Sequence, residues 1–141
     1  MEEKIRKIVK KYGTNDPFEL ADCLGAITIT GPTLDDTRGC YYYYKRNGII
    51  CIDENLNDEE SRMVCAHELG HFILHRKVNS VLLKNTTFLN TNKYEIEANR
   101  FAAYLLISKE DLNEYVKYGY TIDQLACIFK VSKEFMELRL K

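Results

Sequence analysis

The segment CAHELGHFILH, residues 65–75, contains all three histidines of the chain, His67, His71 and His75. The residues around them are apolar or small in nearly every direction of a helix, which is typical of a helix that is buried on all sides. Burying a polar group without a partner costs roughly 1–3 kcal/mol. Some partner must therefore stabilise the histidines and the glutamate of this segment.

The sequence also marks where this helix begins and ends. Asn57 is a favourable N-cap, and Glu60, three residues later, completes a capping box. Asp58 and Glu59 place negative charge in the first turn, where the helix dipole favours it. We expect a central helix that begins after Asn57 and runs to about His75.

A metal ion would satisfy the polar groups in the middle of this helix. His67 and His71 are four residues apart on one face, with Cβ atoms roughly 6 Å apart, so both imidazoles can reach one cation at about 2.0–2.1 Å. Glu68 projects beside them, within reach of a metal-bound water. The pattern H-E-x-x-H predicts Zn²⁺ ligands at His67 and His71 and a general base at Glu68. Two hydrogen-bonded core histidines are the alternative.

His75 is expected to have a different role. It lies two helical turns after His67, about 12 Å along the axis, and cannot complete the same tetrahedron. We expect a side chain at the helix C-terminus, where the dipole favours it. A contact with substrate is the alternative.

The third protein ligand is expected from the segment YEIEANRFAAYLL, residues 94–106. Its apolar stripe contains Ala98, Phe101, Ala102, Leu105 and Leu106. At 100° per residue, Glu95 lies about 65° and Glu97 about 95° from the centre of this stripe.

Glu95 is therefore the preferred ligand, and Glu97 remains the alternative. Asn99, one turn after Glu95, is placed to hydrogen-bond a ligating histidine, as such imidazoles usually require. Two imidazoles and a carboxylate suit Zn²⁺ first, and would also accept Mn²⁺, Fe²⁺ or Co²⁺.

The whole chain fits one α+β domain. Its 141 residues are 45% hydrophobic and 29% charged, which allows a substantial core. Two short helices are expected first, and then β-rich segments at residues 26–30, 41–44 and 48–53. Asn47-Gly48 is a strong hairpin signal, so we expect a small antiparallel sheet packed on the central helix. The five cysteines have no C-x-x-C spacing and are expected to be free thiols.

Charge and hydropathy exclude several classes of function. The net charge is −1, so the chain lacks the basic field that dominates nucleic-acid binding, and direct binding to nucleic acid is not expected. We see no secretory signal and no stretch of about 18 apolar residues, so we expect a cytoplasmic protein without a membrane partner.

Residues 121–140 contain two helical patterns that begin at Thr121 and Ser132 and resemble a helix-turn-helix. The second helix mixes basic and acidic residues, which argues against a phosphate-binding surface. We expect residues 108–141 to form a helical extension of the same compact unit, with a structural or substrate-docking role. A DNA-binding regulator that retains a metal site is the alternative.

The motifs together resemble the ImmA/IrrE metallopeptidases of phages and integrative elements, over about residues 10–110. The resemblance is carried by Asp16-Pro17-Phe18, Ala66-His67-Glu68-Leu69-Gly70-His71, Glu95-x-Glu97-Ala98-Asn99-x-Phe101-Ala102, and Leu105-Leu106. It departs from the family at Ile107-Ser108, where Met-Pro is frequent. Ser108 with Asp111 forms a capping box instead, which leaves the chemistry unchanged.

The resemblance implies a zincin-like (gluzincin-type) domain over residues 1–107 and a zinc endopeptidase that cleaves a helix-turn-helix repressor. It also supports Glu95 as ligand. We expect the substrate to pair with a sheet edge near residues 48–53; the substrate-binding side chains are not identified. A metal-containing regulator that binds a repressor or DNA without cleaving it is the alternative.

Overall fold

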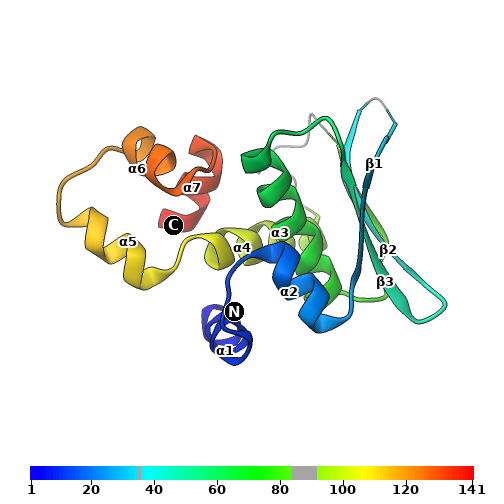
Figure 1. Ribbon diagram of the computed structural model, residues 1–141. Coiled ribbons are helices and arrows are strands. Elements are labelled where there is room, and N and C mark those ends of the chain that lie inside the picture. Colours follow the sequence, from blue (N-terminus) through cyan, green and yellow to red (C-terminus); the bar gives the residue numbers. More distant parts are fainter. Residues whose placement is uncertain (35, 84–91) are drawn as a thin grey trace.

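The computed structural model describes residues 1–34, 36–83 and 92–141. Within these residues the chain forms seven helices and a four-stranded sheet, an α+β architecture as expected (Figure 1). None of the described helices is long and apolar enough to cross a membrane. The elements are α1 (Glu2–Tyr12), α2 (Pro17–Leu24), β1 (Ile27–Gly31), β2 (Thr37–Tyr44), β3 (Asn47–Asp53), α3 (Asp58–Leu74), β4 (Ser80–Leu83), α4 (Lys93–Leu106), α5 (Lys109–Val116), α6 (Ile122–Phe129) and α7 (Lys133–Leu140).

The sheet is mixed, so the expectation of a purely antiparallel sheet is wrong. Its strand order is β1-β3-β2-β4, with β2 antiparallel to both neighbours and β1 parallel to β3. The chain reverses direction between β1 and β2 and again in the hairpin between β2 and β3. Because β1 pairs with the second strand of the hairpin instead of the first, the pair is parallel.

The β2–β3 hairpin is confirmed, but its turn lies two residues earlier than Asn47-Gly48. Tyr44 pairs with Asn47, and the two loop residues Lys45 and Arg46 both have positive φ, 47° and 67°, as two-residue hairpin turns of the primed types require. Gly48 lies instead against α3, where a Cβ would come within 2.3 Å of the Phe72 ring. Gly48 is thus a residue of β3, paired with Tyr43, and is not part of the turn.

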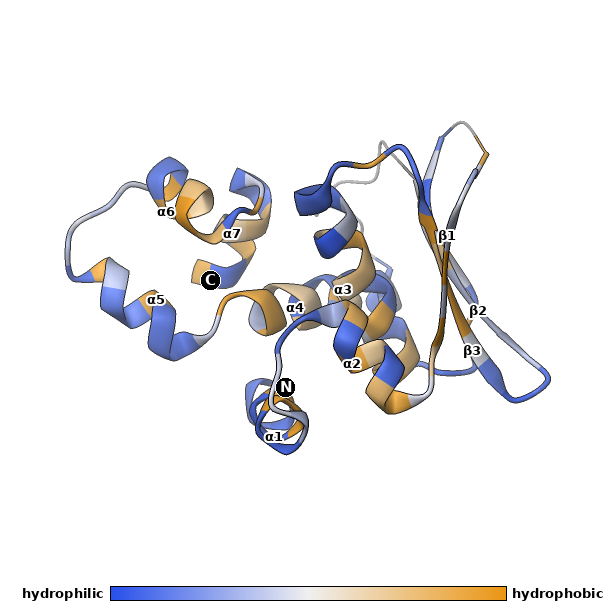
Figure 2. Cartoon of the chain, viewed as in Figure 1, coloured by the Kyte–Doolittle hydropathy of each residue, from blue (hydrophilic) through white to orange (hydrophobic). Residues whose placement is uncertain are grey.

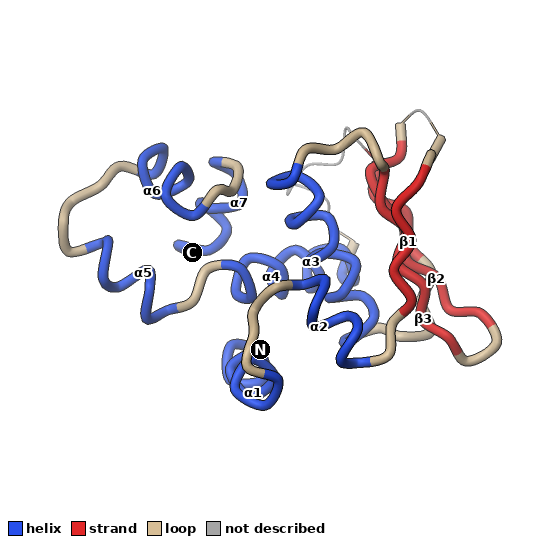
Figure 3. Tube along the Cα trace, viewed as in Figure 1, coloured by secondary structure: helices blue, strands red, loops and turns tan. Residues whose placement is uncertain are grey.

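Helix α3 lies against one face of the sheet and has the predicted ends. Asn57 is its N-cap and forms the capping box with Glu60, and His75 is its C-cap. Figure 3 shows the helices on one side of the strands, and Figure 2 shows polar residues in the first turns of α3 and apolar residues further along it. Ile50 and Ile52 of β3 are fully buried on the helical side.

Helix α4 packs closely on α3 because the contact is made by small residues. A Cβ on Gly70 of α3 would lie 3.2 Å from the Cα of Ala98 on α4 and 3.1 Å from the ring of Phe101. Such spacing leaves no room for a larger side chain at position 70. The close approach brings the first turns of α4 beside the histidines of α3.

The last three helices include the predicted helical pair. Ser108, Thr121 and Ser132 are the N-caps of α5, α6 and α7. Helix α7 is turned inward, since Met136 is fully buried. The Arg139 guanidinium donates from Nε to the Ile107 carbonyl at 2.8 Å.

Strand β4 was not expected from the sequence. It follows α3 after a short connection and pairs with β2, with Ser80 opposite Tyr41. Two hydrogen bonds hold this connection to β2: the Tyr41 hydroxyl donates to the Arg76 carbonyl, and the Tyr43 amide donates to Asn79 Oδ1. The beginning of β4 is thereby placed beside the C-terminal half of α3.

The contact between β2 and α3 at Gly39 generates a stability prediction. A Cβ on Gly39 would lie 2.6 Å from Val64 Cγ1 and 2.9 Å from the Cys51 carbonyl oxygen. We expect Gly39→Ala to lower the free energy of unfolding by about 1–3 kcal/mol, because overpacking forces neighbours to shift. Chemical denaturation measures the change.

Gly31→Ala is the matched control for this prediction. Gly31 is the last residue of β1, and a Cβ there would meet no atom within 4 Å. We expect its effect to stay within about 0.5 kcal/mol, as for ordinary surface changes. Equal stability of the two variants would contradict the close packing of β2 on α3.

Candidate metal site

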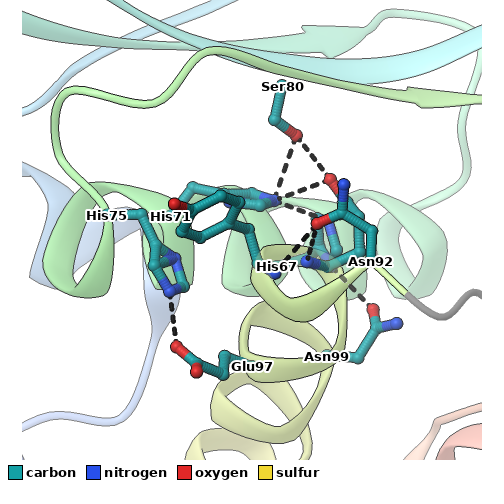
Figure 4. A network of polar contacts seen from close by, with 9 residues as sticks. His67, His71, His75, Ser80, Asn92, Glu97 and Asn99 are labelled. Atoms are coloured by element: carbon teal, nitrogen blue, oxygen red, sulfur yellow. Dashed lines mark hydrogen bonds and ion pairs between the residues drawn. The ribbon is translucent and has the colours of Figure 1, made fainter.

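The candidate site lies between α3, α4 and the beginning of β4. Helix α3 contributes His67, Glu68 and His71, and α4 contributes Glu95 and Asn99. Figure 4 shows the two histidine rings turned toward the amino-terminal part of α4, with Ser80 above them and His75 at one side. Because α3 is capped at both ends and packed on all sides, these side chains project from a rigid element.

His67, His71 and Glu95 bring three possible ligand atoms together. The Nε2 atoms of His67 and His71 are 3.2 Å apart, and each is close to Glu95, at 2.9 Å from Oε2 and 3.2 Å from Oε1 respectively. Donors bound to a tetrahedral zinc ion at 2.0–2.1 Å are roughly 3.3 Å apart. Among the described residues, these three form the group able to hold a metal ion, and their chemistry and spacing fit zinc.

Asn99 holds one imidazole in the orientation that this site needs. Its Oδ1 lies 2.7 Å from His67 Nδ1. Because the amide oxygen can only accept, His67 donates from Nδ1, which leaves the lone pair of Nε2 toward the cluster in the neutral ring. The structure therefore places Asn99 where the sequence predicted a hydrogen-bond partner for a ligand.

Glu68 is fully buried beside this cluster, and neither of its carboxylate oxygens has a hydrogen-bond partner among the described residues. Burial raises the pKa of Glu68 to about 8, and the nearby Glu95 charge adds to the rise while His67 opposes it. An unpartnered buried carboxyl is costly. A cation in the cluster would stabilise its charged form and lower its pKa.

The pKa shifts of Glu95 and His67 also indicate a place for positive charge. Burial acts to raise the pKa of Glu95, but hydrogen bonds from His67 and His71 lower it well below its usual value. Burial acts to lower the pKa of His67, yet the hydrogen bond to Glu95 and the charge of Glu68 raise it. The raised pKa favours a proton on His67 Nε2, between His67 and Glu95. If His67 binds a metal ion as a neutral imidazole, the ion would take the place of this proton.

His71 supplies a neutral ring at the same place. Burial lowers the pKa of His71, and the positive charge of His67 lowers it further, although Glu95 opposes the shift. A neutral imidazole is the form that binds metal. The two histidines therefore differ in charge, but the Nε2 atoms of both contact the Glu95 carboxylate.

The second candidate carboxylate, Glu97, is directed elsewhere. Its Oε2 pairs with Nε2 of His75, whose ring packs against the Tyr94 ring at a centroid distance of 4.7 Å. The His75 backbone amide donates to the His71 carbonyl and caps α3. His75 thus lies at the helix C-terminus as expected, and the structure brings Glu95, not Glu97, to the two histidines.

Comparison with known proteins agrees with this geometry. Residues 25–141 match the model of the IrrE N-terminal-like domain. The chain belongs to the ImmA/IrrE family of metallopeptidases. Two of its relatives are an uncharacterised immunity region protein 2 of Bacillus phage phi105 and the metallopeptidase ImmA of Bacillus subtilis strain 168. The phage protein is 37% identical to this chain, and the match covers 96% of this chain and 85% of the phage protein. The ImmA protein is 30% identical, and the match covers 99% of this chain and 83% of the ImmA protein.

One polar residue at this ImmA/IrrE-family site was missed by the sequence analysis. Ser80 Oγ donates to Glu95 Oε1 at 2.8 Å and lies 3.0 Å from His71 Nε2. No motif marks this serine, because β4 has only four residues and follows a short irregular connection. A serine at the start of an apolar run was the one signal available.

The roles of the two carboxylates can be separated by metal affinity. We expect Glu95→Gln to weaken zinc binding by more than about 100-fold, because loss of a ligand should exceed the 10–100-fold cost typical of a lost supporting hydrogen bond. Glu97→Gln should bind zinc like the unchanged protein, since Glu97 contacts His75 instead of the cluster. Competition with a chromophoric chelator measures both. The reverse order of effects would make Glu97 the ligand.

Asn99 is expected to support the metal indirectly. Asn99→Ala removes the acceptor for His67 Nδ1–H and should weaken zinc binding by about 10–100-fold. Asn99→Asp keeps an acceptor oxygen and should retain most of the affinity. Chelator competition on both variants tests this, and equal losses in the two would show that hydrogen-bond acceptance is not the role of Asn99.

Proposed function

We propose that this family member is a zinc-dependent endopeptidase with a zincin-like (gluzincin-type) arrangement. The observation that carries the proposal is the buried, unpartnered Glu68 carboxyl next to the His67–His71–Glu95 cluster. A cluster that only stabilised the fold would not need a further acid without partners. The same acid is what hydrolysis by an activated water requires.

Each residue of the site has a defined task in this reaction. His67, His71 and Glu95 would hold the zinc ion, which when bound polarises the scissile carbonyl and makes a water molecule more acidic. Asn99 keeps His67 in the ligating tautomer. Glu68 accepts the proton of the attacking water and then delivers it to the leaving amine. Burial disfavours the charged form of Glu68, whereas a cation held by the cluster would favour it.

The expected docking strand for the substrate requires correction. Residues 48–53 belong to β3, which is paired with β1 on one side and β2 on the other, so its edges are occupied. In the described sheet, β4 has one neighbour, and its first residue contacts Glu95. We therefore infer that an extended substrate segment pairs with β4, because added strands bind at an open sheet edge.

The proposed substrate is a helix-turn-helix transcriptional repressor. This follows from what the family resemblance implies, and the immunity region named in the phage relative is consistent with it. Such a substrate would place the reaction in the cytoplasm. Zinc is proposed first, although the donor set also suits Mn²⁺, Fe²⁺ and Co²⁺.

Binding of DNA through α6 and α7 is less well supported. The basic side chain nearest the end of α7, Arg139, is buried and binds the Ile107 carbonyl and Glu2. Lys133 lies 3.9 Å from Asp123 of α6. Arg139 is therefore not available to bind phosphate, and Lys133 has a carboxylate beside it. We infer that the two helices support α4 or contact the repressor.

Glu68→Gln separates metal binding from catalysis. We expect it to retain about one metal ion per chain and to lose cleavage of the repressor encoded beside its gene by at least about 100-fold, since general acid–base groups typically contribute 10²–10⁴-fold. Elemental analysis and a gel-based cleavage assay measure the two properties.

His71→Ala is the control, and it should lose both metal and cleavage. A metal-loaded wild type that leaves the repressor intact yet binds it would contradict the peptidase proposal and favour the non-catalytic regulator. Binding to DNA in a mobility-shift assay, weakened by salt, would favour the DNA-binding alternative.

A further inference from the structure

Ser80 lies within hydrogen-bond distance of the candidate metal ligands but comes from a different element. Its Oγ is 3.0 Å from His71 Nε2 and 2.8 Å from Glu95 Oε1 (Figure 4). These two distances are as short as those among the three candidate ligands, which are 2.9–3.2 Å. Ser80 is therefore as close to His71 and Glu95 as those ligands are to one another.

Ser80 Oγ, His71 Nε2 and Glu95 Oε1 form a triangle with sides of 2.8–3.2 Å, which approximates one face of a tetrahedron. Corner-to-corner distances around zinc are roughly 3.3 Å for donors at 2.0–2.1 Å, and these three sides lie slightly below this. A catalytic zinc site has three protein ligands and a fourth position for water or substrate. The Ser80 oxygen is therefore placed to serve as this fourth donor.

The hydroxyl is also oriented for this position. Ser80 Oγ donates its proton to Glu95 Oε1 at 2.8 Å. A hydroxyl has one proton and two lone pairs. With the proton engaged by Glu95, a lone pair remains for the side that faces His71.

The backbone around Ser80 is held firmly enough to maintain this placement. Ser80 pairs with Tyr41 in the sheet, and the Tyr41 side chain is fully buried. The preceding residue, Asn79, accepts a hydrogen bond from the Tyr43 amide at 3.0 Å. Strand pairing thus positions the Ser80 oxygen. Ser80 also belongs to β4, the strand that we propose pairs with substrate.

We propose that the Ser80 hydroxyl occupies the fourth donor position of the metal site in the resting protein, and that a substrate strand pairing with β4 displaces it. The proposal rests on the metal-dependent function proposed above. A neutral alcohol is a weak ligand compared with a carboxylate or thiolate, so an incoming oxygen can replace it. Ser80 would thereby hold the fourth position until substrate is bound.

Ser80→Cys tests the position directly, because a thiolate at the fourth corner is a strong ligand for cobalt and zinc. The cobalt-loaded variant should show a thiolate-to-cobalt charge-transfer band in the near ultraviolet that the wild type lacks. Its zinc affinity should rise by about 10-fold or more by chelator competition, as expected for an added soft ligand. Asn79→Cys is the matched control and should show no such band, because Asn79 contacts Tyr43.

Ser80→Ala supplies a second readout in case the cysteine variant does not fold, as judged by circular dichroism. Removing the fourth donor should change the visible d–d spectrum of bound cobalt, and Ser80→Thr, which keeps a hydroxyl, should restore it. Unchanged spectra in Ser80→Ala, or a folded, cobalt-loaded Ser80→Cys without the band, would overturn the Ser80 proposal alone. A wild type that takes up no cobalt or zinc would overturn the proposed function as well.

Discussion

The contact between α3 and α4 at Gly70 is the constraint on which the site depends. Gly70 lies between His67 and His71, and Ala98 lies between Glu95 and Asn99, so the point of closest approach is flanked by polar residues on both helices. The small residues let the helix backbones come together. On each helix, the side chains three residues before and one residue after the contact then meet across it, which places Glu95 and Asn99 against the histidines.

This packing buries charged and polar groups together, and the contacts within the site offset the cost of that burial. Two acids and two imidazoles share the region, and Asn99 and Ser80 satisfy some of their hydrogen bonds. Glu68 remains without a partner among the described residues. A divalent cation would balance the two carboxylates, and for this reason the buried polar cluster indicates chemistry more strongly than the H-E-x-x-H pattern alone.

The sequence predicted those parts of the structure that depend on local chemistry. The cap formed by Asn57 and Glu60 could be recognised because capping is a contact between residues three apart. The orientation of Glu95 toward the core could be recognised from the apolar stripe of its own helix. The parallel pairing of β1 with β3 could not, because it depends on residues far apart in the chain. Ser80 was missed for the same reason, since its importance comes from α4 and from pairing with β2.

The position of the hairpin turn shows why local signals can also mislead. Asn-Gly favours the turn when the turn residues are exposed, but here Gly48 is required where Phe72 approaches the strand. A turn at Asn47-Gly48 would take Gly48 out of the strand, where the absence of a side chain lets Phe72 pack against the sheet. The turn is made instead by Lys45 and Arg46, which adopt positive φ.

The C-terminal helices are connected to the site through α4. Arg139 of α7 binds the Ile107 carbonyl at the end of α4, and its guanidinium also lies over the Tyr104 ring at 4.5 Å. A second bond from the same guanidinium reaches Glu2 of α1, so one buried side chain joins three helices. Because α4 carries Glu95 and Asn99, this arrangement restrains the helix that must hold its position against α3. The extension is therefore attached through Arg139 to the end of α4, the helix that carries Glu95 and Asn99.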